Sequence, residues 1–69
     1  MMLEQIRGNW RQMKGAVQEQ WFRLTDDDLE HIDGRLERLV RRIEVRYGVS
    51  TEEAYRQITR WFDELAPAA

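Results

Sequence analysis

Apolar side chains recur at every third or fourth position along most of this chain, which is the spacing of one face of an α-helix. The pattern runs through residues 4–21, 26–32, 35–47 and 51–65, and no segment alternates apolar and polar residues for long. The sequence therefore predicts an all-α domain of four helices without strands. The residues expected in its core are Trp10, Leu29, Leu36, Leu39, Val40, Ile43, Ile58 and Trp61.

With 69 residues and one proline, the chain fits a single domain spanning residues 1–69. Pro67 disfavours further helix, so residues 66–69 are expected to form a short tail. Gly8 and Gly15 lie inside the first predicted helix. A glycine inside a helix is either tolerated or marks a contact or a break, so the first helix could be two pieces that meet at Gly15.

Two N-terminal capping patterns mark the starts of later helices. Thr25 is a good N-cap, and the three aspartates after it suit the partial positive charge of a helix start. Asp28, three residues after Thr25, is placed like the acid of a capping box, and Ser50 with Glu53 repeats the pattern. Gly48 is predicted to end the third helix in a left-handed conformation.

The same three aspartates, Asp26 to Asp28, are also the obvious candidates for a metal site. An EF-hand loop requires glycine at its sixth position, and here that position is His31. Neighbouring residues of a helix point about 100° apart, so three in a row do not converge on one ion. With no cysteine for a zinc site, the sequence predicts no metal and no cofactor, and the aspartates are interpreted as helix caps.

The sequence offers little for catalysis. His31 is the single histidine, and the hydroxyl residues mostly lie at predicted helix starts rather than beside a base. The segment around Lys14 lacks the glycine spacing of a phosphate-binding loop. We therefore expect a protein that is not an enzyme.

Composition also bears on the compartment. The absence of cysteine fits a reducing environment, and no run of about 18 apolar residues predicts a transmembrane segment. The first ten residues lack a basic segment followed by an apolar run, so no secretory signal is indicated. These features predict a cytoplasmic protein.

Arginines form the most conspicuous functional feature, a stripe along the third predicted helix. The stripe consists of Arg35, Arg38, Arg42 and Arg46. Such a ridge could meet phosphates of a nucleic acid. Glu37 and Glu44 lie among the arginines, however, and the net charge is −2, so a solvated helix face with intrahelical ion pairs is the simpler interpretation.

The chain resembles the CsbD-like family of small bacterial stress-response proteins, from Ile6 to about Trp61. The matching segments include Gly8-Asn9-Trp10, Lys14-Gly15, Gln20-Trp21, Leu24 to Asp28, Asp33-Gly34, Leu39-Val40, Ile43 and Arg46-Tyr47-Gly48. The motif residues expected to be structural are Gly8, Asn9, Trp10, Gly15, Trp21, Thr25, Asp26, Asp28, Gly34, Tyr47 and Gly48. The resemblance implies a SAM-like fold of two helical hairpins packed roughly orthogonally, and induction under general stress. It supplies no catalytic residues.

Together these observations favour a non-enzymatic stress-response domain that works by binding or by its abundance, with an unidentified protein as a possible partner. The alternative is a nucleic-acid-associated protein that uses the arginine stripe. An amphipathic membrane-surface protein is the least favoured interpretation, because the core requires the apolar stripe.

Overall fold

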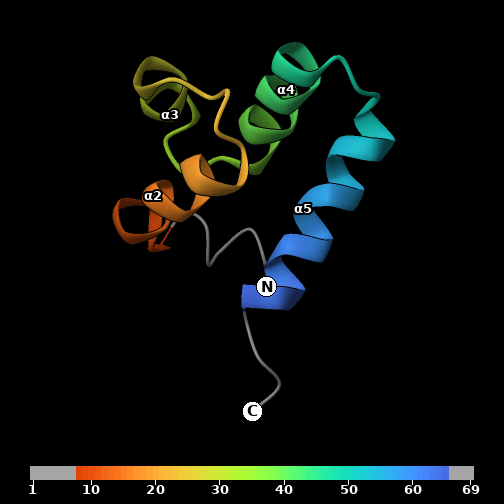
Figure 1. Cartoon of the computed structure of the whole chain (residues 1–69). Helices are drawn as coiled ribbons and strands as arrows, with labels where there is room; N and C mark the ends of the chain where they lie inside the picture. Colours follow the sequence, from red (N-terminus) through yellow and green to blue (C-terminus); the bar gives the residue numbers. More distant parts are fainter. Residues whose placement is uncertain (1–7, 66–69) are drawn as a thin grey trace.

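The computed structural model describes residues 8–65, and these residues form four helices (Figure 1). They are α2 (Trp10–Gln20), α3 (Asp26–Ile32), α4 (Leu36–Tyr47) and α5 (Thr51–Leu65). Residues 8–65 contain no strand, so the predicted all-α class is confirmed. The expected tail at residues 66–69 lies outside the described residues.

The predicted helix boundaries are confirmed for α3 and α5, whereas α4 begins one residue later because Arg35 has extended backbone angles. The helix predicted over residues 4–21 starts outside the described residues, and within them it is interrupted at Asn9 and ends at Gln20. Asn9 has non-helical angles (φ −120°, ψ 23°), and its carbonyl accepts the first hydrogen bonds of α2, from Gln12 and Met13. A new helix therefore begins at Trp10. Gly15 lies within continuous helix, so the suggested break is absent there.

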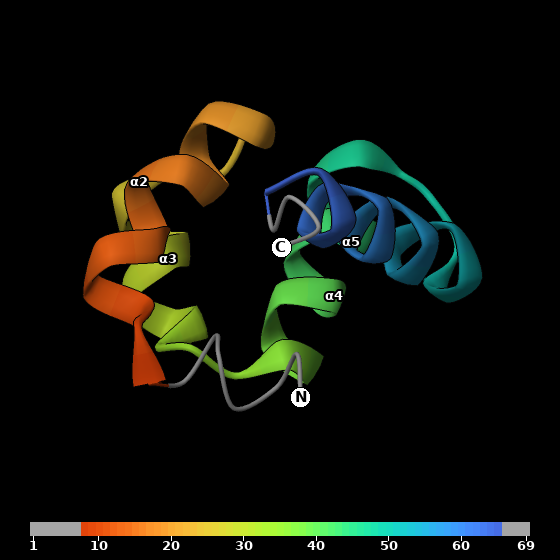
Figure 2. The same ribbon diagram turned by 90° about the horizontal axis from the view of Figure 1, so that it is seen from below.

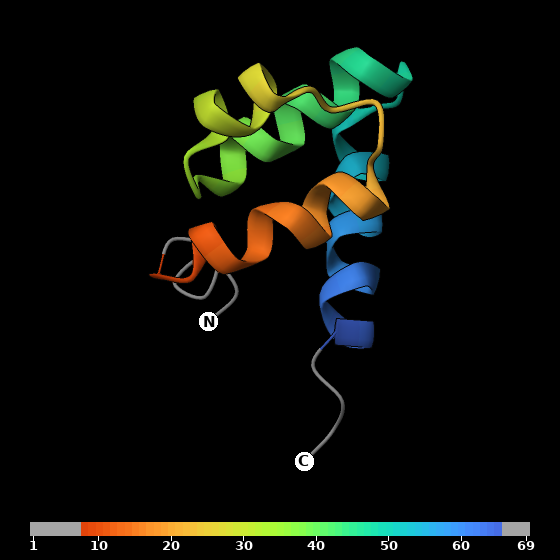
Figure 3. The same cartoon turned by 60° about the vertical axis from the view of Figure 1, so that its left-hand side comes forward.

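Figures 1 and 2 show α2 and α3 on one side of the molecule and α4 and α5 on the other. Helix α4 packs against both α3 and α5. Figure 3 shows α5 running steeply across the direction of α2 and α4. This arrangement agrees with the expected crossing of two hairpins.

The core lies where α4 and α5 meet the α2–α3 pair. It consists of Val17, Trp21, Leu24, Leu29, Ile32, Leu39, Val40, Ile43, Ala54, Ile58 and Trp61. The indole rings of Trp21 and Trp61 meet edge to face with their centroids 5.2 Å apart, which joins the end of α2 to α5. The predicted core positions Trp10 and Leu36 are only partly buried, because each lies at the first residue of its helix, where fewer neighbours surround it.

Two tight turns depend on left-handed backbone. Asp33 and Gly34, between α3 and α4, have φ values of 46° and 75°. Gly48 ends α4 with φ 64°, and its N–H donates to the Glu44 carbonyl at 2.8 Å, as the sequence predicted for a helix end. These turns set the directions in which α4 and α5 start.

We predict opposite effects of alanine at two exposed glycines. A Cβ at Gly48 or at Gly15 would meet no atom within 4 Å, so only backbone conformation distinguishes them. Gly48→Ala should lower the free energy of unfolding by about 1 kcal/mol, because alanine disfavours positive φ. Gly15→Ala should raise it by about 0.5–1 kcal/mol, because Gly15 is inside a helix. Urea denaturation of both variants measures this, and changes of the same sign would contradict it.

Candidate functional site

Asp28 is the one buried charged residue among residues 8–65, with 3% of its surface exposed. It occupies the third position of α3, where Thr25 caps the helix. The Asp28 N–H donates to Thr25 Oγ1 at 3.1 Å, and the Thr25 N–H donates to Asp28 Oδ2 at 3.0 Å. The capping box predicted for Thr25 and Asp28 is therefore confirmed. The one predicted for Ser50 and Glu53 forms only by half: the Glu53 N–H donates to Ser50 Oγ at 3.0 Å, but the Glu53 carboxylate accepts from Arg56 and Gln57 instead.

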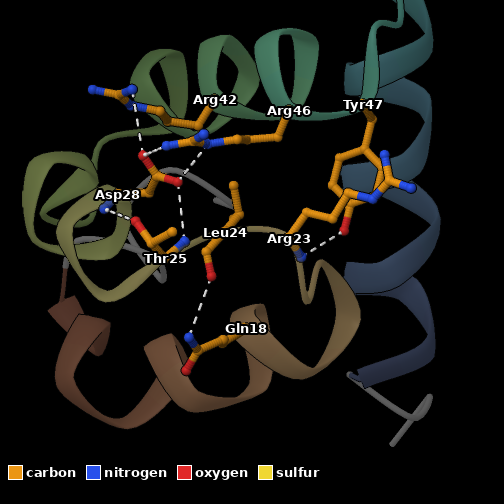
Figure 4. A network of polar contacts seen from close by, with 8 residues as sticks. All are labelled: Gln18, Arg23, Leu24, Thr25, Asp28, Arg42, Arg46 and Tyr47. Atoms are coloured by element: carbon orange, nitrogen blue, oxygen red, sulfur yellow. Dashed lines mark hydrogen bonds and ion pairs between the residues drawn. The ribbon is translucent and has the colours of Figure 1, made fainter.

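The same carboxylate also holds α4 (Figure 4). Arg46 Nε donates to Oδ2 at 2.8 Å and Arg46 Nη2 donates to Oδ1 at 3.0 Å, which is a bidentate pair. Arg42 lies one helical turn earlier, and its Nη1 is 3.3 Å from Oδ1. We call Thr25, Asp28, Arg42 and Arg46 the Asp28 clamp. It joins the start of α3 to the second half of α4.

The electrostatics of the clamp keep Asp28 ionised. The pKa of its carboxyl is lowered from the ordinary 3.8 to about 2. The hydrogen bond from Arg46 is the largest cause, and the bonds with Thr25 and the charge of Arg46 act in the same direction, against the opposing effect of burial. Reciprocally, the hydrogen bond and charge of Asp28 raise the pKa of Arg46. With these partners the buried carboxylate stays ionised at neutral pH, and its ion pair with Arg46 holds α3 against α4.

A second set of contacts fixes the turn between α2 and α3. The Arg23 N–H donates to the Tyr47 hydroxyl at 3.1 Å, and the Arg23 guanidinium lies 5.5 Å from the centre of the Tyr47 ring. Gln18 Nε2 donates to the Leu24 carbonyl at 3.2 Å (Figure 4). Trp21 Nε1 donates to Gln57 Oε1 of α5 at 3.0 Å. The turn is thus attached to α2, α4 and α5.

Phe22 lies within this fixed turn and is 77% exposed. Val45 and Tyr55, on α4 and α5, are the other exposed large apolar residues of the described chain. An exposed aromatic residue on a rigid turn can enter a partner's pocket with little loss of conformational freedom. The sequence showed that Phe22 is aromatic, but its position beside buried Trp21 gave no signal that it would face solvent.

The structure divides the predicted arginine stripe. Arg42 and Arg46 bind Asp28, and Arg38 Nη1 donates to the His31 carbonyl at 2.9 Å. Arg35 is exposed just before α4. Three members of the stripe therefore contact α3, in addition to any intrahelical ion pairs of the kind that the sequence favoured. Their spacing of four was a visible signal, but the sequence did not show that a buried aspartate faced them.

The other predicted residues lie mainly at helix ends. Gly8 and Asn9 precede α2, Trp10 starts it and Trp21 follows it, whereas Gly15 is in its middle. Asp26 and Asp27 are exposed, and so is His31 in the last turn of α3. Within residues 8–65, no group of three or more His, Cys, Asp or Glu residues is placed to hold a metal ion. No helix in this part of the chain is long and apolar enough to cross a bilayer.

We predict that the free energy of unfolding falls at low pH because Asp28 becomes protonated. This carboxyl titrates near pKa 3.8 in the unfolded chain and near 2 in the folded chain, so its stabilisation is complete above about pH 5 and is lost as the pH falls towards 2. The loss should be on the order of 1–2 kcal/mol, because solvent partly screens the arginines. Chemical denaturation between pH 7 and pH 2 measures it.

Asp28→Asn isolates this effect, because the amide oxygen can still accept from Thr25 but carries no charge. We expect this variant to lose about 1–3 kcal/mol at pH 7 and to show a flatter dependence on acid. Asp27→Asn, at the exposed neighbouring position, is the control and should stay within about 0.5 kcal/mol. An unchanged pH profile in Asp28→Asn would contradict the assignment.

Sequence comparison reveals clear relatives. The chain is 48% identical over 63 residues to a UPF0337 protein of Pectobacterium atrosepticum, with 91% of each chain covered. It is 43% identical over 61 residues to the UPF0337 protein YjbJ of Escherichia coli, with 88% of each covered. A UPF0337 protein of Rhodopseudomonas palustris is 41% identical over 60 residues, which are 87% of this chain and 91% of the relative.

No family model and no solved structure matches the chain. The relatives nevertheless span nearly its full length at high identity, and each carries the same family name. This chain therefore belongs to the UPF0337 family, the bacterial CsbD-like proteins that its motifs resemble.

Proposed function

We propose that this protein is a non-enzymatic domain of the bacterial general stress response, which acts in the cytoplasm by binding another molecule. The observation that carries the binding role is Phe22, a largely exposed aromatic side chain on a turn that three helices hold. Aromatic residues are enriched at the centres of protein interfaces because they bury much area with few rotatable bonds. The stress setting rests on the family resemblance.

The Asp28 clamp supports the non-enzymatic part of the proposal. Strongly shifted carboxylates are candidates for acid–base chemistry when they face a cleft without a partner. Asp28 instead has its oxygens bonded by Arg46 and Thr25, and its pKa is lowered rather than raised towards neutrality. A carboxylate with these properties is a poor proton donor or acceptor at neutral pH and a good structural anchor.

The stress role predicts a measurable phenotype. The protein's level should rise in stationary phase or osmotic stress, and deletion of its gene should lower survival, which the wild-type gene should restore. Phe22→Ser should keep the stability of the wild type within about 0.5 kcal/mol and restore survival poorly. Thr59→Ala, at an exposed position of α5, is the matched control and should restore it fully. Equal levels and equal survival with and without the gene would contradict the stress role.

The nucleic-acid alternative has a separate test. If Arg35, Arg38, Arg42 and Arg46 all bound duplex DNA, affinity would fall by roughly a hundredfold between 50 and 200 mM salt. We expect weak or no binding at 150 mM salt, because Arg42 and Arg46 already neutralise Asp28 and the net charge is −2. Fluorescence anisotropy with a labelled duplex measures this. Sub-micromolar binding that Arg35→Glu abolishes would favour the alternative.

A further inference from the structure

A surface hollow lies where the last turn of α3 faces the outer side of α4. Its lining consists of His31, Glu37, Arg38, Arg41, Arg42 and Val45. Three arginines and one glutamate thus share a concave surface, with a histidine at the edge that α3 provides. This surface overlaps the arginine stripe only in part, since Arg35 and Arg46 lie outside it.

Two of the three guanidinium groups are held in place by the fold. Arg38 donates to the His31 carbonyl at 2.9 Å, and this neutral acceptor leaves its positive charge uncompensated. Arg42 is held by Asp28 at 3.3 Å. Fixed guanidinium groups lose less freedom when a ligand binds, which favours binding.

The charge of Arg42 is also only partly offset. Asp28 carries a single negative charge, and Arg46 already makes the two shorter bonds to it, at 2.8 and 3.0 Å. Figure 4 shows one terminal nitrogen of Arg42 directed at Asp28 and the other directed away from the carboxylate. Arg42 therefore retains donors for a second acceptor.

Arg41 is exposed at the same hollow, and Glu37 supplies its one negative charge. The excess of positive charge, together with planar groups that each present several N–H donors, suits an oxyanion with several oxygens. We propose that this hollow binds the terminal phosphate of a small phosphorylated ligand. Arg38, Arg41 and Arg42 would donate to its oxygens, and His31 would supply one further N–H.

This inference names a ligand class for the proposed binding domain and rests on that proposal only for its biological setting. Titration of the purified protein tests the ligand directly, whereas survival of the deletion strain tests the stress role. A failure of one is therefore distinguishable from a failure of the other.

The experiment is a titration of the whole chain with inorganic phosphate and with diphosphate, followed by amide NMR shifts in a phosphate-free buffer. We expect saturable shifts centred on His31, Arg38 and Arg41, with diphosphate binding more tightly. Arg41→Ala should weaken the affinity roughly tenfold, the usual effect of one lost charge-assisted hydrogen bond. Glu37→Gln should strengthen it, because it removes the one acidic side chain of the lining.

Arg60→Ala is the matched control, since Arg60 is an exposed arginine of α5 outside the hollow, and its affinity should equal that of the wild type. Two results would overturn the proposal. One is the absence of saturable shifts at millimolar diphosphate. The other is equal weakening by Arg41→Ala and Arg60→Ala, which would indicate diffuse attraction. Tight binding of a duplex DNA that also requires Arg35 would assign the surface to a nucleic acid instead.

Discussion

The Asp28 carboxylate has two structural roles, and its bond to Arg46 links them. As the third residue of α3, Asp28 closes the capping box with Thr25, and as the buried partner of Arg46 it attaches that helix to α4. A buried charge without partners would be costly, so α3 is stable in this position only when α4 presents its arginines. The start of one helix and the placement of another thus depend on each other.

The neighbouring turn is fixed by the same part of α4. Tyr47 follows Arg46 and accepts from the Arg23 N–H, so two adjacent residues hold the turn and the helix after it. Trp21 donates a hydrogen bond to Gln57 of α5, and its indole ring meets that of Trp61 edge to face. Phe22 is therefore exposed between two anchored neighbours, and the structure presents it in a defined position. This is the physical basis of the proposed binding role.

Arg42 connects the structural clamp with the proposed phosphate site. It faces Asp28 on one side and lines the hollow of His31, Arg38 and Arg41 on the other. A ligand in the hollow would accept hydrogen bonds from the Arg42 guanidinium, which Asp28 orients. Binding should therefore stabilise the contact between α3 and α4. The fold would then prepare the site at no extra conformational cost to the side chain.

The local features of this protein follow from its amino-acid sequence. Apolar spacing predicted four helices. The start of α3 was predicted from Thr25 and Asp28, and the end of α4 from Gly48. Such signals act within a few residues, so they can be recognised in the sequence. The partners that these residues take depend on how the helices pack. Asp28 pairs with Arg46, and the hollow beside Arg41 forms, because packing brings together residues that are distant in the chain. Phe22 is exposed because the fold leaves its side chain without neighbours. The start of α2 at Trp10 was missed because Asn9 lies within an uninterrupted apolar pattern, and periodicity does not register one residue's backbone angles.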